Sequence, residues 1–152
     1  MKKLMLTMLT ILMLITIGGE LNITPFKVTK EADAAAYANP IRYKAPNYYT
    51  TGSCAYYAFN RRAQMGRYVS NQWGNAKYWA SNAVRYGYTV RRSPIKGSVL
   101  VSQSGYYGHV AVVESIYSNG DIIVSEMNYP VRGIKTFRKV YRANVSYYQY
   151  IY

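Results

Sequence analysis

The chain of 152 residues has one cysteine, one histidine and only six acidic residues. A single cysteine excludes an internal disulfide, so Cys54 is either buried and inert, bonded to another molecule, or reactive. One cysteine and one histidine are also too few for a zinc site of the usual kind. We therefore expect neither a metal nor a cofactor.

The apolar run at residues 4–17 is too short to span a bilayer as a helix. Two lysines precede it, and its length is typical of a signal-peptide core. The small-x-small pattern at 32–34 predicts cleavage before Ala35, which defines a signal peptide at 1–34. Five charged residues between the core and the cleavage site are unusual for a signal peptide. They leave an uncleaved N-terminal anchor as the alternative.

Acidic residues are scarcest beyond residue 34, where three remain against 15 basic ones and the net charge is +12. An anionic partner would relieve the self-repulsion of such a cation. Nucleic acid, anionic lipid and cell-wall polyanions all qualify on charge alone, and an export signal favours the wall. All 19 tyrosines also lie in this part of the chain. Their flat rings and hydroxyls suit sugar or peptide surfaces, although core and strand positions account for most tyrosines in folded proteins.

Residues 35–50 contain two prolines and no clear period, which indicates a linker or an extended arm. A helix is predicted to start at Cys54, because Ser53 provides N-cap chemistry and apolar residues recur on one face up to Gly66. A second helix is predicted at about 75–86. Residues 51–152 are expected to form one domain.

After Gly87 the sequence becomes rich in valine, isoleucine and tyrosine, which favours strands. Six strands are predicted, at 89–91, 98–102, 109–117, 122–128, 134–141 and 147–152. Helices followed by an antiparallel sheet predict an α+β fold with the helices on one side of the sheet.

Cys54 and His109 are the candidate catalytic pair. A helix N-terminus stabilises a thiolate and lowers the pKa of a cysteine placed there. His109 opens a predicted strand after Gly108 and is the only imidazole that could act as a base. A cysteine at a helix start with a base on a following strand is the logic of papain-like hydrolases.

The turn at 118–121 contains Asn-Gly, a strong signal for a two-residue hairpin loop. With Asn119 and Gly120 as the loop, His109, Glu126 and Asn128 share one face of the hairpin. Asn128 is then the diagonal neighbour of His109, at roughly 7–8 Å, whereas Glu126 lies roughly 13 Å away. This register favours Asn128 as the residue that orients the imidazole, but a bulge could bring Glu126 closer.

Four segments in order, at 52–66, 73–80, 105–116 and 122–129, resemble the CHAP family of cysteine, histidine-dependent amidohydrolases and peptidases. The similarity is greatest to the staphylococcal secretory antigen A type of CHAP protein and covers about 50–152.

The resemblance implies a papain-like (NlpC/P60-like) α+β fold and a secreted or wall-associated hydrolase of peptidoglycan amides. The bond cut would be the N-acetylmuramoyl–L-alanine amide or a peptide bond of the stem or cross-bridge. The resemblance carries over Cys54 as nucleophile, His109 as general base, Glu126 as the residue orienting the imidazole and Asn128 as a supporting polar residue. We expect peptidoglycan and anionic wall polymers as partners, no nucleic acid, no stable membrane insertion after signal cleavage, and a monomer.

One position departs from the family pattern, because Ser53 stands where members usually have a glutamine that helps to form the oxyanion hole. Losing one oxyanion donor typically costs about 10²–10³ in rate. The alternatives are therefore a slow enzyme, an enzyme that uses the Cys54 backbone N–H, or a catalytically weak wall- or matrix-binding protein. A cationic membrane-active protein is a further alternative. The first helix carries Arg61 and Arg62 but argues against membrane insertion, because its apolar face is mostly alanine.

Overall fold

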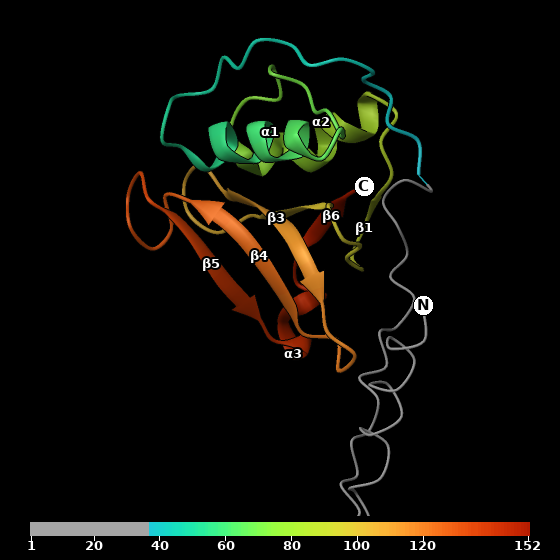
Figure 1. Cartoon of the computed structure of the whole chain (residues 1–152), viewed down its shortest axis with the longest axis vertical. Helices are drawn as coiled ribbons and strands as arrows, with labels where there is room; N and C mark the ends of the chain where they lie inside the picture. Colours follow the sequence, from blue (N-terminus) through green and yellow to red (C-terminus); the bar gives the residue numbers. More distant parts are fainter. Residues whose placement is uncertain (1–36) are drawn as a thin grey trace, which may run out of the picture.

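The computed structural model describes residues 37–152, so the predicted signal peptide at 1–34 lies outside the described part. Two helices lie together over one face of a single sheet (Figure 1), as the sequence predicts. The helical elements are α1 (Cys54–Gln64), the 3₁₀ helix η2 (Ala76–Tyr78), α2 (Trp79–Arg85) and the short α3 (Arg142–Val145). Within residues 37–152, none of these helices has the length and apolar character needed to span a membrane.

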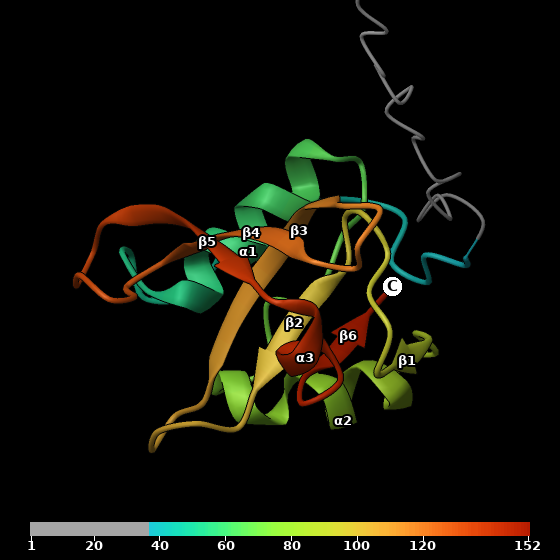
Figure 2. The same cartoon turned by 90° about the horizontal axis from the view of Figure 1, so that it is seen from below.

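The sheet has six strands in the order β1-β6-β2-β3-β4-β5, and every neighbouring pair is antiparallel. The strands are β1 (Val90–Arg91), β2 (Val99–Ser102), β3 (His109–Ile116), β4 (Ile122–Met127), β5 (Lys135–Val140) and β6 (Gln149–Ile151). All six coincide with predicted strands. Figure 2 shows β5 and β1 at opposite edges of the sheet, with α3 close to β6. The short helix α3, which carries the chain from β5 toward β6, was not predicted.

Both faces of the central strand β3 are buried, which is why its sequence is apolar throughout its middle. Val110 and Val112 pack toward the helices, in a cluster that includes Phe59 and Trp79. The alternate residues of β3 pack on the other face with side chains of β2, β4, β5 and β6. The strand that begins at His109 is therefore held rigidly from both sides.

Helix α1 begins where its cap predicts, because Ser53 Oγ accepts a hydrogen bond of 3.1 Å from Tyr56 N–H. Its buried residues are Ala55, Ala58, Phe59 and Arg62. Arg62 is fully buried and donates to the carbonyls of Gly97 and Tyr152. This arginine belongs to the interior and cannot form part of a basic membrane-binding face.

The second predicted helix is divided into η2 and α2. The first turn is a 3₁₀ turn, because the N–H of Tyr78 donates to the carbonyl of Asn75 at 2.9 Å. The N–H of Lys77, which has no acceptor within a helix that starts here, donates to the carbonyl of Tyr107 at 3.0 Å. A Cβ at Gly108, which has φ +72°, would lie 2.5 Å from the Lys77 nitrogen. Only glycine permits this close approach, which fixes the loop immediately before His109.

The β3–β4 hairpin differs from the predicted register. Tyr117 N–H donates to the carbonyl of Asp121, so three residues rather than two form the loop. The pairing then shifts again between Val113 and Ser115, where Glu114 is the extra residue of a β-bulge. The two changes together move Glu126 two residues closer to His109 than the two-residue loop implies.

Residues 37–50 contain no helix or strand, yet part of this segment packs on the domain. Tyr49 packs against the helix-side core, and its hydroxyl donates to the carbonyl of Ser70 at 2.8 Å and accepts from Trp73 N–H at 3.1 Å. The ring of Tyr49 also lies 5.2 Å from that of Trp79. These contacts attach the end of the segment close to the start of α1.

Candidate active site

Cys54 is the first residue of α1 and is half-buried. Burial alone would raise the pKa of its thiol, but a hydrogen bond and charge interaction with His109 outweigh this effect. Hydrogen bonds from the backbone of Val110 and Ala55 act in the same direction. The pKa of Cys54 therefore lies below its usual value, which favours the thiolate.

His109 begins β3 and joins the sulfur to a carboxylate. Its Nε2 lies 2.9 Å from Glu126 Oε2, which leaves Nδ1 as the ring nitrogen for Cys54. Burial lowers the pKa of the imidazole, but the hydrogen bonds and charges of Cys54 and Glu126 raise it to about 9. A lowered thiol pKa beside a raised imidazole pKa favours a thiolate–imidazolium pair at neutral pH.

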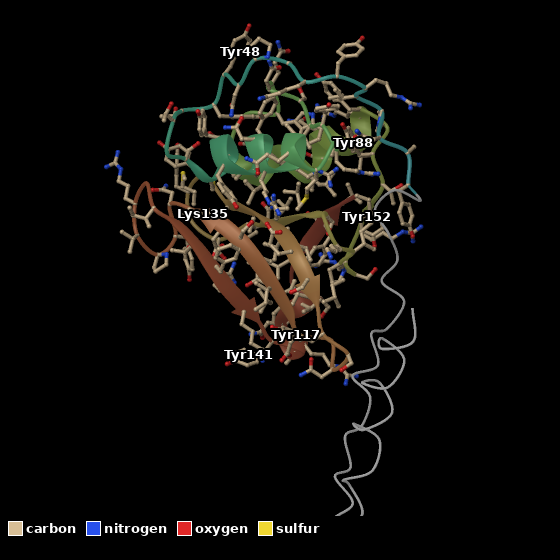
Figure 3. The ribbon with its side chains drawn as sticks, viewed as in Figure 1. Tyr48, Tyr88, Tyr117, Lys135, Tyr141 and Tyr152 are labelled. Atoms are coloured by element: carbon tan, nitrogen blue, oxygen red, sulfur yellow. The ribbon has the colours of Figure 1, made fainter. Side chains whose placement is uncertain are left out.

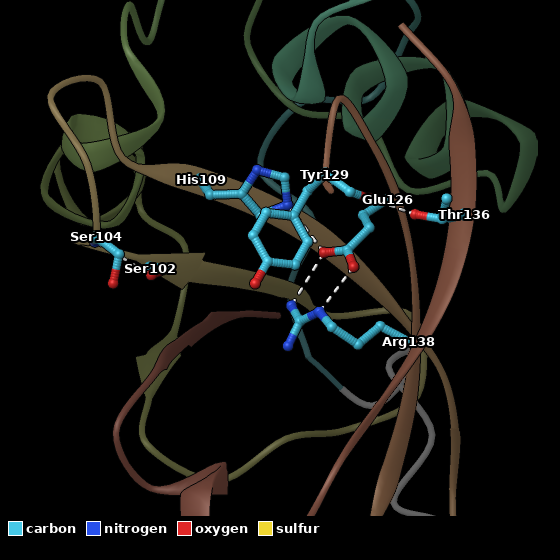
Figure 4. Close-up of polar contacts among 7 residues, drawn as sticks. All are labelled: Ser102, Ser104, His109, Glu126, Tyr129, Thr136 and Arg138. Carbon is cyan, nitrogen blue, oxygen red and sulfur yellow. Dashed lines mark hydrogen bonds and ion pairs between the residues drawn. The ribbon is translucent and has the colours of Figure 1, made fainter. Parts of the chain in front are cut away.

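Glu126 is fully buried on β4 and is held by Arg138 of β5. Arg138 Nε and Nη2 donate to its two carboxylate oxygens at 2.7 and 3.0 Å (Figure 4). Burial raises the pKa of Glu126, but the hydrogen bonds from His109 and Arg138 lower it below the usual value. The carboxylate is thus ionised and oriented before it meets the imidazole.

Tyr129 covers the histidine and the arginine together. Its ring centroid lies 5.4 Å from that of His109, and the Arg138 guanidinium carbon lies 5.3 Å from it. Figure 4 shows this ring beside the hydrogen bonds that join His109, Glu126 and Arg138. The tyrosine shields these charges from water, which strengthens their interaction.

Asn128 has a different role from the predicted diagonal neighbour of the imidazole. It has a left-handed backbone with φ 67°, and its Oδ1 accepts from Gly133 N–H at 3.2 Å. Its side chain therefore holds the loop between β4 and β5, while Glu126 is the residue bonded to the ring. Asn128 still lines the groove described below.

Cys54 and His109 both line an open groove of about 760 Å³. Asn75, Ala76 and the loop at 104–108 contribute to one part of its lining, and Tyr129 and Arg138 to another. A ligand in this groove would reach the sulfur and the imidazole at the same time. In residues 37–152, no group of three or more histidine, cysteine or acidic side chains is arranged to hold a metal ion.

The N-terminal turn of α1 also supplies candidate donors for an oxyanion. The first N–H groups of a helix have no acceptor within the helix. Ser53 uses its hydroxyl for Tyr56 N–H and its carbonyl for Tyr57 N–H. The Cys54 N–H, adjacent to the sulfur, is then the candidate oxyanion donor, and Ser53 serves as a cap.

Replacing Ser53 by alanine should therefore lower stability without a comparable loss of rate. We expect a decrease of about 1 kcal/mol in the free energy of unfolding, as for other N-cap serines. Thermal denaturation and the rate of substrate turnover measure the two effects separately. A large fall in kcat with unchanged stability would instead identify the Ser53 hydroxyl as an oxyanion donor.

Comparison with known proteins agrees with this fold and site. The CHAP domain model matches residues 44–128, and the chain belongs to the CHAP family. Among curated relatives, N-acetylmuramoyl-L-alanine amidase sle1 of Staphylococcus saprophyticus is 45% identical over 120 residues, which cover 78% of this chain and 36% of the relative. The protein of the same name from Staphylococcus aureus USA300 is 40% identical over 140 residues, covering 89% and 42%. The chain thus spans about two fifths of the length of these relatives.

Solved structures give the same result for the fold. A crystal structure of N-acetylmuramoyl-L-alanine amidase from Staphylococcus aureus superposes with a TM-score of 0.63 at 34% identity, covering 66% of this chain and 30% of that one. A structure of Ly7917 with the hydrolysing product of MDP has a TM-score of 0.50 at 24% identity, covering 74% and 59%, and supports the fold alone. The predicted papain-like α+β fold is confirmed.

Sequence analysis did not identify Arg138 or Tyr129. Arg138 lies on a predicted strand, and β4 pairs with β5 so that Val124 faces Arg138 and Glu126 faces Thr136. Pairing the two predicted strands 122–128 and 134–141 would have put Arg138 on the face of Glu126. No sequence pattern indicates the position of Tyr129, because this residue follows β4 and its position depends on the loop between β4 and β5.

Proposed function

We propose that this chain is a cysteine hydrolase that cleaves an amide bond of bacterial peptidoglycan. One observation carries the proposal. Cys54 and His109 line one open groove, where their interaction lowers the pKa of the thiol and raises that of the imidazole, and the buried Glu126 holds Nε2 of the same ring. Membership of the CHAP family and relatives named N-acetylmuramoyl-L-alanine amidases support the choice of substrate.

The reaction begins with attack of the Cys54 thiolate on the scissile carbonyl, which forms a carbon–sulfur bond. The Cys54 N–H stabilises the oxyanion of the tetrahedral intermediate. The His109 imidazolium then protonates the leaving amine as the carbon–nitrogen bond breaks. The neutral imidazole takes a proton from water, which hydrolyses the acyl-enzyme and regenerates the thiolate. Glu126 and Arg138 keep the ring oriented through both steps.

The bond cut is either the N-acetylmuramoyl–L-alanine amide or a peptide bond of the stem or cross-bridge. The names of the relatives favour the first. Mass spectrometry of fragments released from purified walls distinguishes the two. An amidase frees the lactyl carboxylate of the glycan and the amine of L-alanine, whereas a peptidase leaves that amide intact. If no new amine or carboxylate forms, the hydrolase proposal is wrong.

A catalytically weak wall- or matrix-binding protein is the second candidate, and the presence of Ser53 where the family usually has glutamine favours it. This candidate predicts binding without release of fragments. It also predicts that Cys54 reacts with alkylating reagents no faster than free cysteine, since an inactive site has no need of a thiolate.

We also propose that the protein acts outside the cell, in the medium or on the wall. Relatives named as amidases of a wall component support this location. In this proposal residues 1–34 are a secretion signal, 35–50 are an arm and 51–152 are the catalytic domain. The family match from residue 44 includes the end of the proposed arm.

Anionic wall polymers are the second proposed partner, and the exposed side chains of β5 are suited to them. This basic–aromatic face consists of Lys135, Phe137 and Lys139 of β5 and of Tyr141, which follows the strand. Lys135 Nζ lies 4.8 Å from the Phe137 ring centroid, and Lys139 Nζ lies 5.1 Å from that of Tyr141. Phe137 and Tyr141 are 62% and 61% exposed. In Figure 3, Lys135 lies toward one end of the sheet and Tyr141 toward the other.

Removing part of this face should weaken wall binding. We expect the double variant Lys135→Gln, Phe137→Ala to bind walls several-fold more weakly and with a shallower salt dependence, because fewer counterions are released on binding. The matched control is Tyr43→Ala, Lys44→Gln, which removes an exposed lysine and an exposed aromatic ring from the segment before α1. Equal losses in both variants, or no loss in the β5 variant, would contradict a specific role for β5.

A further inference from the structure

We propose that Glu114 and Arg61 are positioning residues that set the register of β3 against β4 and thereby bring Glu126 to His109. Only the expected effect of these residues on kcat rests on the proposed function; their effect on the titration of His109 does not. The inference gives the reason why Glu126 lies within hydrogen-bond distance of the His109 ring.

The bulge at Glu114 decides whether Glu126 and His109 lie on the same face of the hairpin. On the turn side of the bulge, Ser115 pairs with Ile123 and Ile116 with Ile122. Continued without a bulge, that register would put Glu126 opposite Val112, on the face that packs against the helices. One extra residue shifts the pairing to Val112 with Ser125. Continuing this shifted register puts Glu126 opposite Ala111, on the face of His109.

The side chain of Glu114 fastens the bulge on both sides. Arg61 Nε and Nη2 donate to its two carboxylate oxygens at 2.7 and 2.6 Å. From the opposing strand, the hydroxyl of Ser125 donates to Glu114 Oε1 at 2.5 Å. Ser125 is fully buried, and the side chain of Glu114 is only 17% exposed. A shift in register would break these hydrogen bonds and leave a buried hydroxyl without its acceptor.

Arg61 connects this bulge to the helix of the nucleophile. It lies seven residues after Cys54 on α1, which is about two helical turns or roughly 10 Å along the axis. The ion pair therefore joins the element that carries the sulfur to the strand that carries the imidazole. Because the ion pair of Arg61 and Glu114 also holds the register of β3 against β4, it fixes the position of the Glu126 carboxylate on β4. This one bidentate pair thus links α1, β3 and β4.

The test uses the titration of His109, which gives a single imidazole resonance because the untagged chain has no other histidine. In Glu114→Ala and in Arg61→Ala, we expect the pKa of His109 to fall below about 9, since Cys54 still raises it but Glu126 no longer holds Nε2. The rate constant kcat should fall at least about tenfold with KM nearly unchanged. The double variant should be no worse than the more affected single variant, because both break one interaction.

Asp121→Asn is the matched control, because it removes an acid and an ion pair of 2.8 Å from the turn end of the same hairpin. It should leave the His109 titration unchanged. Thermal melts confirm that each variant is folded, and Arg61→Ala tests the inference if Glu114→Ala does not fold. An unchanged titration in folded Arg61→Ala overturns the inference, whether or not the parent cuts walls. A lowered pKa supports it even if wall cleavage is absent and the proposed function fails.

Discussion

Replacing Cys54 by alanine should abolish the clearing of purified cell walls. Removal of a catalytic nucleophile typically costs on the order of 10⁴ to 10⁶ in kcat, because binding and oxyanion stabilisation alone remain. The side chain is half-buried and alanine is smaller, so the fold should persist. Turbidity of wall suspensions and mass spectrometry of the supernatant measure the loss.

The same variant separates catalysis from adhesion. Wall binding should be retained in Cys54→Ala, since the basic–aromatic face of β5 does not involve the sulfur. A variant that binds and does not clear supports the nucleophile. Clearing at the rate of the parent would show that Cys54 is not the nucleophile.

The second large effect is expected for Glu126→Gln. Glutamine keeps the volume but removes the negative charge that raises the pKa of His109 and that Arg138 neutralises. Without the charge of Glu126, the His109 imidazolium loses its proton at a lower pH. Less of the thiolate–imidazolium pair of Cys54 and His109 is then present at neutral pH. We expect kcat to fall by about 10² to 10³, and the alkaline limb of the pH–rate profile to move to lower pH.

Asn128→Ala is the companion variant, because sequence register alone favoured Asn128 as the partner of the ring. Its Oδ1 accepts from Gly133 N–H in the β4–β5 loop, so we expect a smaller loss of rate and an alkaline limb that stays in place. Steady-state rates from pH 5 to 10 compare the two variants. A shifted limb in Asn128→Ala with an unchanged one in Glu126→Gln would reverse the two assignments.

Much of the fold follows from local chemistry that the sequence displays. The start of α1 depends on Ser53 and the six strands depend on runs of valine, isoleucine and tyrosine, and both predictions are confirmed. The division of the second helix into η2 and α2 could not be predicted, because its first turn packs against a distant loop, where the Lys77 N–H donates to the Tyr107 carbonyl and Gly108 lies against Lys77. Tertiary contacts override helix propensity at such positions.

The arrangement of the candidate site could be predicted only in part. Cys54, His109 and Glu126 were named as candidates, but the predicted register put Asn128 closer to the ring. The error arises from a three-residue loop and from the bulge at Glu114. The bulge is held by Arg61, a contact across 53 residues of sequence that no local pattern reveals. Arg138 was missed for the same reason, since its role depends on pairing between strands.

The ion pair of Cys54 and His109 is tested most directly by the rate of Cys54 alkylation with iodoacetamide between pH 4 and 10. The protein has a single cysteine, so the rate reports this site alone. The lowered thiol pKa and the imidazole pKa of about 9 predict fast alkylation at neutral pH, with a second change in rate near pH 9 as His109 loses its proton. A single titration at the pKa of an ordinary thiol, with no step due to histidine, would contradict the proposed mechanism.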